Sequence, residues 1–401
     1  GEVMADASSS DDGTSMFVIT IAVVAVGLVV GFVARRLLGG GDGAARAAAK
    51  AKRREQQRRP VPDSVKAAAA RGGVSVTGVF LYPLKSGRAV SVASWPLDVA
   101  GPMHDRRWMV VDASGRFQSQ RQIPRLALIE ARLGVDTPKG GSQNPDDGFD
   151  GITLADGSPE AGRAGAMEDL SVPLVVSGDS EAETVVVEVW GEKFDNAVDQ
   201  GDDAARWLCE FLRKDGLRLV HMDDACIRHV PPGFPLEEGA VAAGSKTSNR
   251  VSLADGFPML MTSEESLADL RESINAGAGR GGASEAKGEG EGAALPMNRF
   301  RPNIVVRGAE AWAEDWWRRV TIGNVRLHGV KRCTRCIQTT TDQATAEQGG
   351  FYAEPLKTLR AARLEPLSKA TVCFGMNVCH AWPPPQGEEL VLRVGDEVVV
   401  E

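Results

Sequence analysis

The chain is organised around one stretch, Lys331-Arg332-Cys333-Thr334-Arg335-Cys336-Ile337-Gln338-Thr339-Thr340-Thr341-Asp342, in which an arginine directly precedes each of two cysteines. Cysteine thiolates are soft ligands that bind soft metals. Neighbouring arginines favour the thiolate form and also hold anions. The stretch therefore predicts a metal-binding or redox thiol beside an anion site. Because threonine has β propensity, we expect an extended segment after Cys336.

Three other interpretations of this cysteine pair remain open. Cys373 and Cys379 could complete a structural zinc site, although their five-residue separation is wider than the usual two to four residues. A thioredoxin-like pair requires a helix after the cysteines, which the threonines disfavour. The pair could also be two ordinary cysteines of an intracellular domain, because the six cysteines of the chain are irregularly spaced and do not resemble a disulfide framework.

Outward from this stretch, the body of the chain from Val74 onward consists mainly of short β-prone segments. Residues 74–84 alternate and are rich in β-branched residues, as is typical of strands. Strands are also predicted at residues 89–97, 172–190, 217–222, 372–378 and 388–400. Residues 202–212 begin with two aspartates and have the apolar spacing of an amphipathic helix. A second helix, with a capping-box pattern at its start, is predicted from Thr262 to Ile274. We therefore expect a mainly β body, an antiparallel barrel or sandwich with few helices.

The N-terminal region predicts a membrane anchor. Residues 16–33 contain no charged side chain, and at ~1.5 Å per residue such a helix just spans a hydrocarbon core of ~30 Å. Acidic residues precede this run and Arg35 and Arg36 follow it, so an uncleaved signal anchor is favoured, with the C-terminal side in the cytosol. We expect residues 1–15 to be disordered and residues 34–72 to form a basic linker that is attracted to anionic headgroups.

The charge distribution limits the partners of the body. The formal net charge of the chain is −8, yet residues 34–71 carry eleven lysines and arginines against three acids. The body that follows is therefore clearly acidic. An acidic body is a poor nucleic-acid binder, so no nucleic-acid partner is expected.

Eight short motifs occur in one order along the body. They are Tyr82-Pro83-Leu84-Lys85-Ser86, Asp105-Arg106-Arg107-Trp108, Arg121-Gln122-Ile123-Pro124-Arg125-Leu126, Asp255-Gly256, Ser263-Glu264-Glu265-Ser266-Leu267, Phe300-Arg301-Pro302-Asn303, Cys333-Thr334-Arg335-Cys336 and Phe374-Gly375. Together they resemble the MOSC-domain family and, within it, the subfamily of mitochondrial amidoxime reducing components. The resemblance covers roughly residues 74–400.

The resemblance implies an N-terminal β-rich MOSC region over residues 73–222. A MOSC β-barrel domain then follows over residues 223–401. Within that range, the low-complexity composition of residues 275–294 predicts a disordered insertion. It also implies the molybdenum–molybdopterin cofactor, with Cys336 as the catalytic residue and the molybdenum ligand. The cofactor contacts that it implies are Lys85, Ser86, Arg106, Asp255, Gly256, Phe257, Arg301, Asn303, Thr334 and Arg335. For residues 255–257 the implied contact is through the backbone.

The implied reaction is the two-electron reduction of small N-hydroxylated compounds such as amidoximes and N-hydroxylamines. The one-electron reduction of nitrite to nitric oxide is a further activity that the resemblance implies. Electrons would come from NADH through cytochrome b5 reductase and cytochrome b5, and the anchor would lie in the outer mitochondrial membrane with the catalytic body in the cytosol. Two other function classes stay open: a sulfur carrier, like the MOSC domains of molybdenum cofactor sulfurases, and a non-catalytic β module with structural zinc.

The chain departs from the family pattern at three positions. Thr334 stands where serine is frequent, Met376 where glutamine is common, and Gln343 where proline is usual. Thr334 keeps the hydroxyl. Met376 lacks the amide through which a side chain at that position could contact the cofactor. Cys333 is expected either to support the metal ligand from behind or to be a packing residue.

Overall fold

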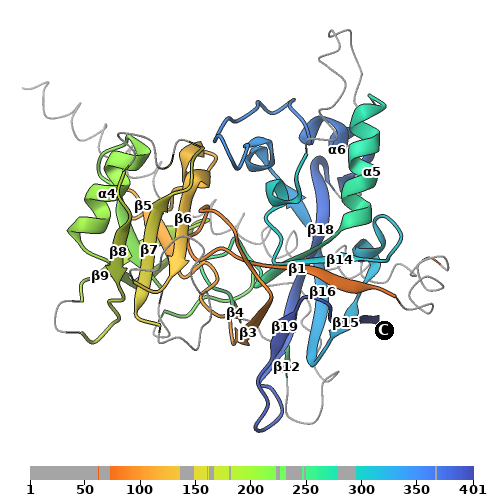
Figure 1. Cartoon of the computed structure of the whole chain (residues 1–401), viewed down its shortest axis with the longest axis horizontal. Coiled ribbons are helices and arrows are strands. Elements are labelled where there is room, and N and C mark those ends of the chain that lie inside the picture. Colours follow the sequence, from red (N-terminus) through yellow and green to blue (C-terminus); the bar gives the residue numbers. More distant parts are fainter. Residues whose placement is uncertain are drawn as a thin grey trace, which may run out of the picture. The chain divides into compact units, whose positions relative to one another are not determined.

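The computed structural model describes residues 62, 73–135, 149–159, 161, 167–179, 182–222, 226–231, 246–247, 250–277, 295–365 and 368–401. These residues form three α-helices and twenty β-strands, which confirms the predicted mainly β class (Figure 1). The predicted disordered N-terminus, the predicted anchor at residues 16–33 and nearly all of the basic linker lie outside the described residues. In the part of the chain that is described, no helix is long and apolar enough to cross a membrane.

The largest sheet has ten strands and draws them from both ends of the body. In spatial order they are β2 (Val90–Val92), β1 (Ser75–Leu81), β14 (Ile304–Arg307), β13 (Met259–Ser263), β18 (Ser368–Trp382), β16 (Val325–Arg335), β15 (Arg319–Ile322) and β20 (Val398–Val400), and β12 (Lys246–Thr247) and β17 (Leu364–Glu365) also pair with β18. Neighbouring strands are antiparallel except for β13 and β14, which are parallel. The sheet therefore crosses the boundary predicted between residues 222 and 223.

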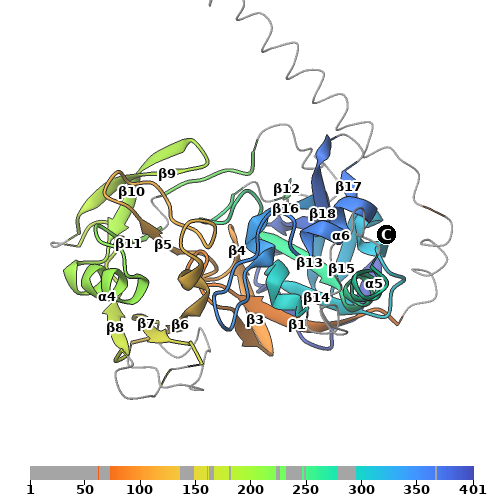
Figure 2. The same ribbon diagram turned by 90° about the horizontal axis from the view of Figure 1, so that it is seen from above.

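Three smaller sheets complete the β structure (Figure 2). The first contains β5 (Trp108–Val111), β11 (Arg218–His221), β10 (Glu192–Asp199) and β9 (Thr184–Val189). The second contains β19 (Val391–Arg393), β3 (Ser94–Asp98) and β4 (Gly101–Pro102), and the third contains β6 (Ile129–Leu133), β7 (Gly151–Asp156) and β8 (Leu170–Pro173). Because β19 pairs with β3, the second of these sheets also joins segments from early and late in the chain.

Helix α4 (Asp202–Leu212) confirms the first predicted helix. Two aspartates occupy its first turn, where acidic side chains interact favourably with the helix dipole. The helix ends at Arg213, which has a left-handed φ of 55°. Its apolar face is buried, and the rings of Trp207 and Phe211 are stacked with centroids 4.9 Å apart.

Helix α5 (Glu264–Asn275) confirms the second predicted helix, but its cap differs from the predicted capping box. Ser263 caps the helix and accepts a hydrogen bond at 3.1 Å from the backbone N–H of Ser266, which stands where a capping box has Glu or Gln. The helix includes the first residue of the predicted insertion, and residues 278–294 lie outside the described residues. The remaining helices are α6 (Leu356–Ala362) and four 3-10 helices, η1 (Pro124–Leu128), η2 (Met297–Phe300), η3 (Ala313–Trp316) and η4 (Ile337–Thr340).

The prediction of an extended segment after Cys336 is wrong, because the 3-10 helix η4 begins there. The threonine hydroxyls explain the difference. Thr339 Oγ1 donates to the carbonyl of Cys336 at 2.9 Å, and Thr340 Oγ1 donates to the carbonyl of Ile337 at 2.7 Å. Each bond reaches back three residues and closes a helical turn, so local hydrogen bonding outweighs β propensity here.

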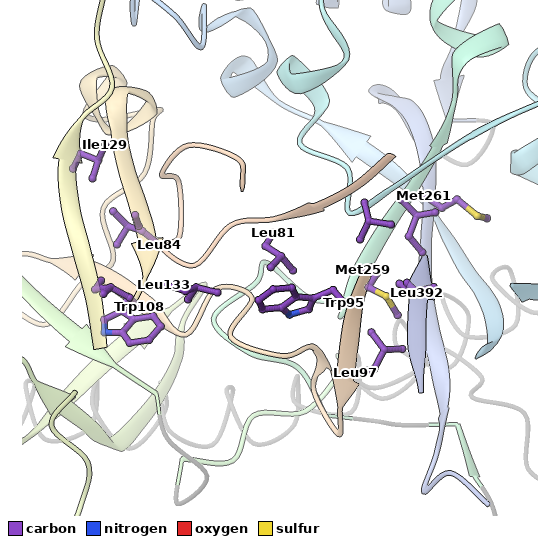
Figure 3. Packing of buried hydrophobic residues seen from close by; sticks show 14 of the residues in the cluster. Leu81, Leu84, Trp95, Leu97, Trp108, Ile129, Leu133, Met259, Met261 and Leu392 are labelled. Carbon is purple, nitrogen blue, oxygen red and sulfur yellow. The ribbon is translucent and has the colours of Figure 1, made fainter. Parts of the chain in front are cut away.

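One hydrophobic cluster runs through both halves of the body (Figure 3). Trp108 and Ile129 lie on one side of it, Met261 and Leu392 on the other, and Trp95 lies between them. All five side chains are essentially inaccessible to solvent. A shared apolar core of this kind fixes the segments that leave the sheets around it.

Candidate functional site

The register of three strands explains where the predicted site residues lie. In the antiparallel pair β1 and β14, Val79 stands opposite Ile304, and in the parallel pair β13 and β14, Met261 stands opposite the same residue. The segment after β1, the segment before β14 and the loop before β13 therefore leave the sheet at one edge. These segments carry Lys85 and Ser86, Arg301 and Asn303, and residues 255–257 respectively.

Asn303 connects the three segments through its side chain, which is 1% exposed. Its Oδ1 accepts hydrogen bonds from Arg106 Nη1 at 2.9 Å and from the backbone N–H of Leu260 at 3.3 Å. Its Nδ2 donates to the carbonyl of Phe80 at 3.1 Å. The amide thus holds Arg106 against β1 and β13, so most of its hydrogen-bonding capacity is used within the protein.

Tyr82 belongs to the first of the eight motifs, but the sequence predicted no role for it in the site. The guanidinium carbons of Arg106 and Arg301 each lie 4.2 Å from the centre of its ring, which is close enough for cation–π attraction. Its hydroxyl donates to the carbonyl of Pro302 at 3.1 Å, and burial raises the pKa of this phenol to about 12. Tyr82 is therefore neutral at physiological pH and orients two cations.

Three of the predicted contact residues have a left-handed backbone. The φ angles are 68° for Ser86, 49° for Arg106 and 57° for Arg301. This region is uncommon for residues other than glycine, and such conformations cluster at binding and catalytic sites. Sequence pattern gave no sign of them.

Lys85 is buried, and its ammonium has two protein partners. Nζ lies 2.5 Å from Asp255 Oδ1 and donates to the carbonyl of Leu253 at 2.7 Å. Burial lowers the pKa of Lys85 to about 8. For the Asp255 carboxyl, desolvation acts to raise the pKa, but the charge and hydrogen bond of Lys85, together with a hydrogen bond from Trp190, lower it overall. An ion pair at the margin of the site results.

The loop before β13 is held by a buried arginine that sequence reasoning did not single out. Arg228 Nη1 donates to the carbonyls of Ser252 at 2.7 Å and Ala254 at 2.6 Å. The ring of Phe257 packs against a small apolar cluster that includes Val330 and Cys379. Its side chain is therefore occupied, which leaves the backbone of residues 255–257 for contact with a ligand.

Cys336 is exposed at the point where β16 ends and η4 begins. Its backbone is still extended, with φ −124° and ψ −177°, so the strand alternation continues through it. Thr334 and Cys336 therefore lie on one face of the strand, and Cys333 and Arg335 lie on the other. Both residues of the first pair are exposed, so small molecules can reach the Cys336 thiol from solvent.

The side chain of Arg335 lies on the other face of the same strand. Its Nη2 donates to the carbonyl of Phe300 at 2.8 Å, and its Nη1 donates to the Cys333 sulfur at 2.8 Å. Since Cys333 and Cys336 occupy opposite faces, the arrangement does not fit a thioredoxin-like pair. In the described ranges, no group of three or more histidine, cysteine or acidic side chains is placed to hold a metal ion. The zinc interpretation finds no ligand cluster there.

Two departures from the family pattern have a structural explanation. Gln343 exchanges amide hydrogen bonds with Gln120 at 2.9 and 3.0 Å, and Gln120 Nε2 donates to the carbonyl of Ser86 at 2.8 Å. This pair joins the segment after Cys336 to the turn that carries Lys85. Met376 is 5% exposed and belongs to the main hydrophobic core, so its side chain packs inside the protein.

The site has more positive than negative groups. Four cations, Lys85, Arg106, Arg301 and Arg335, face two acids, Asp105 and Asp255. Among the described residues, Nη2 of Arg301 and Nε of Arg335 are buried without a hydrogen-bonding partner. Burial lowers the pKa of Arg301 to about 10. Buried donors are normally paired, so this set fits an anionic group, and the adjacent Cys336 thiol fits a soft metal.

Comparison with known proteins gives two adjacent family matches. The MOSC N-terminal beta barrel domain matches residues 73–215, and the MOSC domain matches residues 248–399. Mitochondrial amidoxime-reducing component 1 of Mus musculus is 30% identical over 72% of this chain and 72% of its own length. The Danio rerio protein of that name is 31% identical over 75% and 78%. Molybdenum cofactor sulfurase of Danio rerio is 28% identical over 81% of this chain but only 34% of its own length.

Proposed function

Because the chain belongs to the MOSC-domain family together with the mitochondrial amidoxime-reducing components, we propose that it is a molybdenum-dependent oxidoreductase that reduces small N-hydroxylated compounds. One observation carries the proposal: Arg301 and Arg335 each have a buried guanidinium nitrogen without a partner among the described residues, and Arg335 directly precedes Cys336, whose side chain is exposed where β16 ends. A pterin cofactor with a phosphate and a metal needs these two kinds of group together.

Each residue of the site has a role in this proposal. Cys336 would supply the protein thiolate to molybdenum, and Thr334 and Arg335 flank it. Lys85, Arg106 and Arg301 would bind the anionic parts of the cofactor, and Ser86 and the backbone of residues 255–257 would bind its polar edges. Asn303 would act mainly by positioning Arg106, because its Oδ1 already accepts from that guanidinium.

The bound cofactor would supply the two-electron redox chemistry that removes oxygen from an N–OH group. The overall change consumes two electrons and two protons, gives the N–H compound, and releases water. The protein would hold the cofactor at a solvent-accessible face, because Cys336 and Thr334 are both exposed there. Arg335 would keep the strand carrying Cys336 in place by its bond to the carbonyl of Phe300.

We propose further that electrons come from NADH through cytochrome b5 reductase and cytochrome b5. The uncharged run at residues 16–33 and the basic residues after it support an anchor with the catalytic body in the cytosol. The word mitochondrial in the names of the relatives supports a mitochondrial location, and the outer membrane is proposed because a body in the cytosol requires it. Confinement to one membrane would raise the effective concentration of the redox partners.

A sulfur-carrier role is the second candidate, because a molybdenum cofactor sulfurase also matches most of this chain. In that case the exposed Cys336 would accept and pass on sulfur. The match covers 34% of the length of that sulfurase.

Purified protein tests the proposed reductase function. Molybdenum, pterin and zinc contents are measured, and reduction of benzamidoxime is followed with an artificial electron donor. We expect one molybdenum per chain and activity that Cys336→Ala abolishes, while the matched control Cys333→Ala keeps most of it. Stoichiometric zinc without molybdenum, or full reductase activity in Cys336→Ala, would reject the proposal.

A further inference from the structure

The tip of the β9–β10 hairpin places an unusual residue beside the site. Its two-residue turn consists of Trp190 and Gly191, with φ angles of 55° and 84°. Positive φ at both positions is typical of a tight hairpin turn, in which Asn-Gly or Asp-Gly is normally preferred. Here the first position holds a tryptophan that is 53% exposed. Neither turn geometry nor core packing accounts for a large aromatic residue there.

The hairpin tip is fixed to the loop that carries Asp255. Glu192, the first residue of β10, pairs with Arg228 through Oε2 and Nε at 3.0 Å. The same Arg228 holds the carbonyls of Ser252 and Ala254. The Trp190 side chain lies near the Asp255 carboxylate and helps to lower the pKa of that acid. The indole is therefore held in a set position at the margin of the candidate site.

Arg121 lies over this indole, with its guanidinium carbon 4.2 Å from the ring centre. Its Nε donates to Ser119 Oγ at 3.1 Å, whereas its two Nη atoms have no hydrogen-bonding partner in the described part of the chain. The guanidinium is also 5.7 Å from the ring of Phe117, and Lys85 Nζ is 5.2 Å from that ring. Arg121 thus extends the group of cations beyond Lys85, on the side of Trp190.

We propose that Arg121 and Trp190 form a subsite for the oxyanion of a ligand, a phosphate or a carboxylate, at the margin of the cofactor site. A guanidinium with two free Nη atoms can bind such a group in a bidentate manner. The indole face keeps the guanidinium plane oriented. Asp255, the acid beside it, is already paired with Lys85, so Arg121 is left for a ligand. The inference rests on the proposed function for the identity of that ligand.

The oxyanion has two possible sources, the phosphate of the cofactor and an acidic group on a planar substrate. Two variants of the full-length protein separate them: Arg121→Gln, and the matched control Arg116→Gln at an exposed position of the preceding turn. Molybdenum and pterin contents are measured after gel filtration. The protein is titrated with phenyl phosphate, followed by tryptophan fluorescence, and KM is compared for benzamidoxime and 4-carboxybenzamidoxime.

If the cofactor phosphate occupies the subsite, Arg121→Gln retains several-fold less cofactor than Arg116→Gln. If an acidic substrate occupies it, cofactor content is equal, phenyl phosphate quenches the wild-type fluorescence but not that of Arg121→Gln, and KM for the carboxylated substrate alone rises about tenfold or more. Trp190→Leu should reproduce either pattern in weaker form.

The inference is overturned if Arg121→Gln matches Arg116→Gln in cofactor content, in the titration and in both KM values. Failure of the proposed function looks different: the wild-type protein then contains no molybdenum. The phenyl phosphate titration still decides in that case, because binding that depends on Arg121 supports the subsite and binding that does not depend on it rejects the subsite.

Discussion

Replacing Asn303 with alanine should destabilise the fold and empty the site in one step. The change removes the side-chain partner of the N–H of Leu260 and of the carbonyl of Phe80, and it removes one of the two partners of Arg106 Nη1, which still pairs with Asp105. Each buried group left unpaired costs ~1–3 kcal/mol. The Leu260 bond, at 3.3 Å, is the longest and contributes least. We therefore expect the free energy of unfolding to fall by about 3 kcal/mol, which is a large fraction of the ~5–15 kcal/mol of a typical protein.

Asn324 provides a matched control on the same body. Its side chain also makes two backbone hydrogen bonds, to the carbonyl of Glu389 at 2.7 Å and from the N–H of Val391 at 3.3 Å. Because Asn324 is exposed, water replaces those bonds in Asn324→Ala, and the loss should stay below ~1 kcal/mol. Urea unfolding followed by tryptophan fluorescence measures both variants. Equal losses would refute the idea that the buried amide joins the three segments, as would an Asn303→Ala protein that keeps its full cofactor content.

Three further predictions concern single buried side chains. Burial, together with Asp315, raises the pKa of Glu314 to about 7 from 4.5. The contribution of Glu314 to stability is therefore complete below pH 4.5 and is lost as pH rises through 7. Glu314→Gln should remove this pH dependence and raise the free energy of unfolding at pH 8 by about 3 kcal/mol, measured by thermal unfolding. Because Lys85 loses its charge above pH 8, wild-type protein dialysed at pH 9.5 should retain less molybdenum than at pH 7, and Lys85→Met should show no such difference. Gln343→Ala breaks the amide pair with Gln120 and should reduce stability by about 1–3 kcal/mol; an unchanged urea midpoint would contradict this.

The sequence was sufficient for features that depend on local pattern. The strand-rich class and helices α4 and α5 follow from apolar spacing and from acidic residues near the helix starts. The prediction of an extended segment after Cys336 was wrong. The propensity of threonine favours strands, whereas the hydroxyls of Thr339 and Thr340 close a helical turn. Such side-chain bonds depend on backbone geometry, which propensity does not describe.

The site itself could be predicted only through the resemblance, because its contacts join residues far apart in the chain. Tyr82 and the carbonyl of Pro302 are 220 positions apart, and only the pairing of β1 with β14 brings them together. Arg228, Gln120 and Trp190 were missed for the same reason. Their partners lie on other segments, and none of the three stands in a distinctive local pattern.

The balance of charge links the fold to the proposed chemistry. The chain as a whole has a formal net charge of −8, yet the buried cations Lys85 and Arg301 lie at one sheet edge together with Arg106 and Arg335, and only two acids face these four cations. Arg301 is 8% exposed and still has a buried nitrogen without a partner. Burying an unpaired cation opposes folding, and an apolar residue at that position would remove the penalty. A bound anion would offset this penalty without changing the residue, so we infer that this edge of the sheet is completed by a negatively charged ligand.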